Sequence, residues 1–148
     1  MNTAPTGRTP VRILHLEDDE NDYLLVKEML AADGLACELT LARTRSEFEQ
    51  ALRANQYDLI ISDYTLPSYD GMKALALMRQ YQSRVPFIFF SGTIGEEIAV
   101  ESLKTGATDY VVKQRPRRLV AAVHRALQEA EERARLEAAR TALRESEE

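Results

Sequence analysis

The chain is poor in the features that mark secreted, membrane-bound and nucleic-acid-binding proteins. Its single cysteine, Cys37, permits neither an intrachain disulfide nor a thiolate metal site, which fits a reducing compartment. The first ten residues lack both a secretory signal pattern and a span long enough for a bilayer. The net charge of −5 argues against nucleic acid, and the arginines at 115, 117 and 118 fit a solvated helix entry. We expect a cytoplasmic protein that contacts neither membranes nor nucleic acids directly.

Short apolar runs alternate with helical periodicity, which is the pattern of an α/β protein with a doubly wound parallel sheet. With 148 residues, 45% of them hydrophobic, the chain is expected to form one domain with a substantial core. The expected strands lie at 11–16, 36–41, 58–62, 86–91 and 108–112. The expected helices lie at 21–33, 45–55, 71–82, 95–105 and from Pro116 onward, and residues 1–10 are expected to be disordered.

Local signals support these helix limits. Gly34 and Gly106 stand where C-terminal caps are expected, because glycine adopts the left-handed conformation that ends many helices. Thr44 and Glu47 have the spacing of a capping box at the start of the second helix.

Acidic residues follow two of the expected strands. Asp63 comes directly after the run at 57–62, and Glu17, Asp18 and Asp19 follow the first strand. The carboxyl ends of parallel strands meet at one edge of a sheet, so these acids are expected to converge. Two carboxylates about 4 Å apart repel by roughly 4 kcal/mol at an effective dielectric near 20, which favours a compensating cation. Magnesium prefers such oxygen ligands and often binds phosphate as well, so the pattern indicates phosphoryl chemistry, in which an aspartate can be the acceptor.

These motifs resemble the receiver domain of bacterial two-component response regulators, from Val11 to the helix that begins near Pro116. Four separated segments carry the resemblance together, at 13–19, 58–71, 87–92 and 109–113. The resemblance implies a flavodoxin-like sheet with strand order 2-1-3-4-5 and a receiver domain at 11–128.

The resemblance also implies roles for the residues of the site. Asp63 would be the phosphoacceptor, and Mg²⁺ would be held by Glu17, Asp18, Asp63 and the backbone carbonyl of Thr65, with Asp19 outside this ligand set. Ser91 and Lys113 would bind phosphoryl oxygens, and the rotamer of Tyr110 would follow Ser91 as a switch. The phosphodonor would be a histidine kinase or a phosphotransfer protein. Such a receiver catalyses only its own phosphorylation and dephosphorylation.

One position departs from the pattern of this family. The family usually has a proline with a cis bond directly after the lysine, whereas Gln114 follows Lys113 here. A cis bond before a residue other than proline costs roughly 3 kcal/mol, so we expect a trans bond and a reshaped loop.

The stretch from Pro116 to Glu148 contains no glycine and is dense in helix-forming residues, which predicts one helix that extends beyond the sheet. Its apolar residues keep coiled-coil spacing only as far as Ala134, so residues 129–148 are expected to form a helical linker or short coiled coil, through which a homodimer is possible. The ending resembles a helix that leads into a PAS domain. We therefore expect a longer signalling protein, with a PAS, kinase or cyclase output.

Two other functions stay open. The chain is alternatively a phosphorylation-independent interaction or dimerisation module in which the acidic pocket is vestigial. Gln114 supports this alternative, because it stands where the family usually has proline. An aspartate-nucleophile phosphatase ranks last, because it would need a second aspartate where Thr65 stands.

Overall fold

A five-stranded parallel sheet forms the centre of the molecule. The computed structural model describes residues 10–92 and 95–147, so the prediction of disorder for residues 1–9 lies outside the described residues. The sheet strands are β1 (Val11–Leu16), β2 (Cys37–Ala42), β3 (Leu59–Ser62), β6 (Phe87–Ser91) and β7 (Asp109–Val112). Their order is β2-β1-β3-β6-β7, with every neighbouring pair parallel. The predicted doubly wound sheet and its strand order are confirmed.

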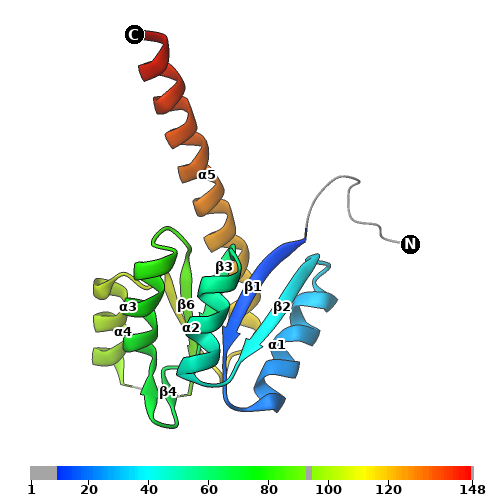
Figure 1. The fold of residues 1–148 in the computed structure, drawn as a ribbon. Coiled ribbons are helices and arrows are strands. Elements are labelled where there is room, and N and C mark those ends of the chain that lie inside the picture. The colour runs from blue at the N-terminus through cyan, green and yellow to red at the C-terminus, as the bar shows by residue number, and fades with distance from the viewer. Residues whose placement is uncertain (1–9, 93–94, 148) are drawn as a thin grey trace.

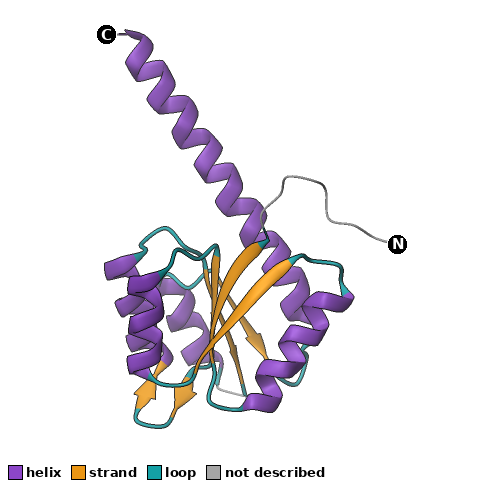
Figure 2. Ribbon diagram, turned by 45° about the vertical axis from the view of Figure 1, so that its right-hand side comes forward, coloured by secondary structure: helices purple, strands orange, loops and turns teal. Residues whose placement is uncertain are grey.

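Helices cover both faces of this sheet (Figures 1 and 2). The helices are α1 (Glu20–Ala32), α2 (Arg45–Ala54), α3 (Gly71–Tyr81), α4 (Glu96–Thr105) and α5 (Arg117–Glu147). One apolar cluster joins the sheet to α1 and α5, and a second joins the opposite face to α2 and α3. Successive residues of β1 show the division, because Ile13 belongs to the first cluster and Leu14 to the second. Strands β3 and β6 are apolar up to their last residues, Ser62 and Ser91, since both of their faces are buried.

The helix ends follow the local signals only in part. Gly106 caps α4 in the left-handed conformation, with φ of 118°. The Thr44 hydroxyl accepts a hydrogen bond from the Glu47 N–H at the start of α2, as predicted. The carboxylate of Glu47, however, accepts from the N–H of Arg43 instead of that of Thr44, so the reciprocal half of the capping box is shifted by one residue.

Four strand starts and one hairpin differ from the sequence prediction. Strands β2, β3, β6 and β7 each begin one residue later than expected, and β2 also ends one residue later. Asp58, which precedes β3, accepts a hydrogen bond on its side chain from the Arg12 N–H. The hairpin consists of β4 (Thr65–Leu66) and β5 (Tyr69–Asp70) and was not predicted. Ser68 forms its turn with φ of 60°, directly after Pro67.

The last helix, α5, has 31 residues and confirms the predicted long C-terminal helix. Its first turns pack against the sheet, and its last fully buried residue is Ala126. Residues 131–147 are all exposed, and Figure 1 shows this part of α5 projecting beyond the edge of the sheet at which the strands begin. No helix in the described ranges 10–92 and 95–147 is long and apolar enough to cross a membrane.

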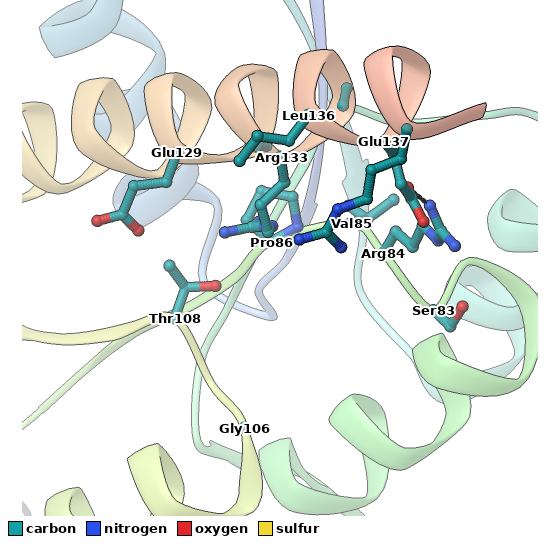
Figure 3. A pocket seen from close by; sticks show the side chains of 13 residues that line it. Ser83, Arg84, Val85, Pro86, Gly106, Thr108, Glu129, Arg133, Leu136 and Glu137 are labelled. Carbon is teal, nitrogen blue, oxygen red and sulfur yellow. Dashed lines mark ion pairs between the residues drawn. The ribbon is translucent and has the colours of Figure 1, made fainter. Parts of the chain in front are cut away.

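A groove of about 710 Å³ runs under the projecting part of α5 (Figure 3). The loop at 83–86, Gly106 and Thr108 form its floor, at the edge where β6 and β7 begin. Arg84 of this loop forms an ion pair with Glu137 of α5 and so ties the helix to the body of the domain.

Candidate functional site

Four strand ends bring the predicted site residues together at the carboxyl edge of the sheet. Glu17 follows β1, Asp63 follows β3, Ser91 ends β6 and Lys113 follows β7. In the sheet, β1 lies next to β3, β3 lies next to β6, and β6 lies next to β7. The doubly wound topology therefore builds the site, since it collects chain segments that are far apart in the sequence.

Three carboxylates form a cluster that could hold a metal ion. Oxygen atoms of Glu17, Asp18 and Asp63 all lie within 4.8 Å of one another. Glu17 and Asp63 are buried and Asp18 is half-buried, so the cluster has one open side. Such a set of hard oxygen donors fits Mg²⁺, which binds one or two protein carboxylates and keeps part of its shell for water or phosphate. Asp19 lies outside the cluster and instead caps α1, accepting from the N–H groups of Asn21 and Asp22.

Lys113 supplies the positive charge of the site. Its ammonium nitrogen lies 2.8 Å from Glu17 Oε2, 2.8 Å from Asp63 Oδ2 and 2.8 Å from Asp22 Oδ2. Only 18% of the side chain is exposed. Burial disfavours the charged form, but the hydrogen bonds that the ammonium donates to the carboxylates outweigh this effect and raise the pKa of Lys113 above its ordinary value. The lysine is therefore a permanent cation in this pocket.

Asp63 is held as a carboxylate. Burial alone would raise its pKa, yet hydrogen bonds from Lys113 and Ser91 lower the pKa of Asp63 below its ordinary value. The Ser91 hydroxyl donates to Oδ1 over 2.5 Å, and the Thr65 N–H donates to the same oxygen over 3.3 Å. An ionised oxygen nucleophile at the mouth of a pocket is what acceptance of a phosphoryl group requires.

Glu17 has the opposite environment. Its side chain is fully buried, and burial raises the pKa of Glu17 from 4.5 to about 7, although Lys113 and the N–H of Asp19 oppose that rise. A buried carboxylate that is this costly to ionise gains from a cation beside it. This supports the fit of the cluster to a divalent ion.

The predicted switch pair lies on the other side of Asp63. Ser91 also accepts a hydrogen bond from the Tyr64 N–H over 3.3 Å, so its hydroxyl joins the end of β6 to the loop after β3. Tyr110 has its ring 5.9 Å from that of Phe89 and its hydroxyl buried, which is the inward orientation. Burial raises the pKa of Tyr110 and keeps its phenol neutral.

The loop after Lys113 is built without the usual proline. No cis peptide bond occurs in the described residues, so the bond between Lys113 and Gln114 is trans, as predicted. The Lys113 N–H donates to the Ser91 carbonyl over 2.7 Å, and the Arg115 N–H donates to the Val112 carbonyl over 3.0 Å. These two bonds hold the backbone of the lysine at the edge of the sheet.

Three features of the site were not found by sequence reasoning. Asp22 was not identified as a partner of Lys113, because 91 residues separate the two in the chain. Gly71 lies so close to the site that an added Cβ would meet the Phe89 ring and come within 2.8 Å of the Asp63 carbonyl oxygen. His15 is fully buried on β1, and burial, reinforced by Lys113, lowers its pKa to about 3, so the imidazole is neutral.

The comparisons with known proteins agree with this geometry. The sequence model of the response regulator receiver domain matches residues 13–124. The chain is 36% identical over 103 residues to the transcriptional regulatory protein RprY of Bacteroides fragilis, covering 70% of this chain and 43% of that protein. It is 39% identical over 108 residues to the transcriptional regulatory protein BasR of Escherichia coli, covering 70% and 46%. The chain thus spans less than half the length of these two relatives.

Solved structures show the same fold. A CheY-like response regulator receiver domain protein from Methanospirillum hungatei matches with a TM-score of 0.75 and 27% identity, covering 84% of this chain and 99% of that one. The signal receiver domain of a Luxo repressor protein from Vibrio parahaemolyticus matches with a TM-score of 0.79, covering 87% and 98%. At 23% identity, this second likeness concerns the fold alone.

Proposed function

We propose, because the chain belongs to the response regulator receiver domain family of two-component signalling, that Asp63 accepts a phosphoryl group from a histidine kinase or phosphotransfer protein. The observation that carries the proposal is the ionised Asp63 carboxylate, which contacts the Lys113 ammonium and clusters with the carboxylates of Glu17 and Asp18. The phosphorylated domain then signals through α5. We place this reaction in the cytoplasm.

In the proposed reaction an Asp63 oxygen attacks the phosphorus of a phosphohistidine. The P–O bond forms as the P–N bond breaks, and the imidazole nitrogen leaves with the electron pair and takes up a proton from solvent. Lys113 neutralises charge on the phosphoryl oxygens, and Ser91 donates its hydroxyl to one of them. Both groups already bond Asp63 in this structure, so little reorganisation is needed.

Glu17, Asp18, Asp63 and the Thr65 carbonyl would hold Mg²⁺ in this proposal, since the three side chains cluster and Thr65 follows Asp63 by two residues. When bound, the ion would neutralise the negative charge of the transferring group. The fully buried Glu17 keeps water away from one side of the cluster, and the half-buried Asp18 leaves the other side open to the phosphodonor.

The signal is proposed to leave the site through Ser91 and Tyr110. A phosphoryl group on Asp63 would draw the Ser91 hydroxyl towards it, which changes the space beside Tyr110 on β7. Strand β7 packs against α5, and Arg125 of α5 forms an ion pair with Asp109 at the start of β7. Complete switching from 1:99 to 99:1 requires about 5.5 kcal/mol, so we expect a partial population shift.

Incubation with acetyl phosphate and magnesium tests the proposal. Intact-mass measurement is expected to show one added phosphoryl group on the wild type and none on Asp63→Asn, which keeps the shape of the side chain without the nucleophilic charge. Glu20→Gln is the matched control, because it removes an exposed carboxylate of α1 from outside the metal cluster. Wild-type protein that stays unmodified while folded would refute the mechanism.

A second candidate function is a dimerisation module that does not depend on phosphorylation. It is favoured by the projecting part of α5, on which Leu136 and Leu143 are 55% and 62% exposed. Residues 131–147 bury no apolar face against the domain, and most helical stability in proteins comes from such packing, so a partner helix would stabilise this part of α5. Sedimentation would then show a dimer that Leu136→Glu dissociates and Asp63→Asn leaves intact. A monomer at all concentrations would remove this candidate.

A further inference from the structure

The ammonium of Lys113 is shared among three carboxylates, and one of them has no other role in the site. Glu17 and Asp63 belong to the metal cluster, whereas Asp22 comes from the first turn of α1. We propose that Asp22 is a positioning residue that holds Lys113 in place while Glu17 and Asp63 bind other groups. This inference rests on the proposed phosphotransfer to Asp63.

The need for such a residue follows from the partners that Lys113 loses during the reaction. A lysine ammonium has three donor hydrogens, and the structure offers three carboxylate oxygens at 2.8 Å. In the proposed reaction Glu17 would turn to the cation, and the charge of Asp63 would pass to the phosphoryl oxygens. Asp22 is then the carboxylate that remains with the lysine throughout.

The contact between Asp22 and Lys113 matters because a lysine side chain is flexible. Its four-carbon side chain loses considerable rotamer freedom when it is fixed in one place. Gln114 provides no ring to stiffen the loop after Lys113, and the backbone bond to Ser91 fixes only the lysine's main chain. The Asp22 carboxylate fixes the other end of the side chain, 2.8 Å from its nitrogen.

Asp22 is itself held rigidly. The Asp19 side chain caps α1 and accepts hydrogen bonds from the N–H groups of Asn21 and Asp22, so the backbone at Asp22 is locked into the helix. The side chain of Asp22 is only 30% exposed. A carboxylate in the first turn is also stabilised by the helix dipole, but Glu20 shares that benefit without appearing among the partners of Lys113. The contact with Lys113 is therefore what distinguishes Asp22 from an ordinary first-turn acid.

The test compares rates of phosphorylation by acetyl phosphate, with Phos-tag gels or intact mass as the readout. Asp22→Ala is expected to slow phosphorylation about tenfold, the usual effect of losing one hydrogen bond to a charged group. Asp22→Asn keeps an acceptor oxygen in place and is expected to retain a rate within about threefold of wild type. Glu20→Ala is the matched control, because it removes a first-turn carboxylate from the same helix and should leave the rate unchanged.

A double variant separates positioning from general damage to the fold. In a Lys113→Ala background, Asp22→Ala is expected to have no further effect, because the group that it positions is gone. Asp22→Ser, whose hydroxyl is too short to reach the ammonium, repeats the test if the alanine variant melts at a lower temperature than wild type. The inference is overturned if Asp22→Ala and Asp22→Ser are both phosphorylated at the wild-type rate, or if Asp22→Ala slows the Lys113→Ala protein as much as it slows the wild type. Either result leaves the proposed function intact. Wild-type protein that takes up no phosphoryl group overturns the proposed function and this inference with it.

Discussion

Replacing Glu17 by glutamine should stabilise the metal-free protein at alkaline pH. The Glu17 side chain is fully buried, and burial raises its pKa from 4.5 to about 7. Keeping this group ionised in the folded state therefore costs about 3 kcal/mol. Glutamine has nearly the same shape and keeps one of the two oxygens, which can accept from the Lys113 ammonium, so the variant gives up only the hydrogen bond that Glu17 Oε1 accepts from the Asp19 N–H. The variant should thus lose the ionisation cost and keep the packing.

The sign of the pH dependence follows from proton linkage. Between the unfolded pKa of 4.5 and the folded pKa of about 7, the folded state of the wild type binds the extra proton, so its stability falls as pH rises. Above that window the full cost is present. Glu17→Gln is therefore expected to exceed the wild type by up to about 3 kcal/mol at pH 8, and by much less at pH 5.

Urea denaturation in the presence of a chelator, from pH 5 to pH 8, measures this difference. His15, whose pKa is lowered to about 3, contributes a pH dependence of its own, but it is present in both proteins and cancels. Magnesium should then stabilise only the wild type, by about 2.7 kcal/mol at one hundred times its Kd. A stability difference that does not change with pH, or a variant that is less stable at pH 8, would refute this reasoning.

Three further predictions concern the supports of the site and of α5. Gly71→Ala should lower stability by about 1–3 kcal/mol and slow phosphorylation, because the new Cβ meets the Phe89 ring and the Asp63 carbonyl; thermal melting and intact mass would show both effects. Gln82→Leu should cost about 2–4 kcal/mol in urea denaturation, because the buried amide bonds two carbonyls of the α2 end and the Tyr57 N–H, while phosphorylation stays complete. Arg84→Ala should speed hydrogen exchange in the projecting part of α5 with less than about 1 kcal/mol change in global stability, since its ion pair with Glu137 is exposed.

The core of the fold could be predicted because its signals are local. Each sheet strand is a short apolar run, and each helix has its own cap or periodicity, so strands and helices were located to within one or two residues. The hairpin of β4 and β5 escaped prediction because its strands have two residues each and show no alternation. Its turn at Pro67 and Ser68 carried the only local signal.

The site could be predicted only where strand ends define it. Glu17 and Asp63 follow apolar runs directly, so the rule that parallel strands end at one edge brings them together, whereas Ser91 and Lys113 were predicted from the family resemblance. Asp22 lies on a helix, and nothing near it in the sequence indicates which cation it contacts. Its pairing with Lys113 depends on how α1 is set against β7, which is a property of the packed sheet.

The straightness and length of α5 give the molecule a mechanical property. At 1.5 Å per residue, the exposed portion from 131 to 147 is about 25 Å long. The buried turns before it anchor its base, and the Arg84–Glu137 ion pair contacts it partway along. A tilt of about 10° at that anchor would displace the far tip by roughly 4 Å, more than a side-chain hydrogen bond can stretch. A small tilt of α5 at its base would therefore move the tip of the helix further than it moves the turns that pack on the sheet.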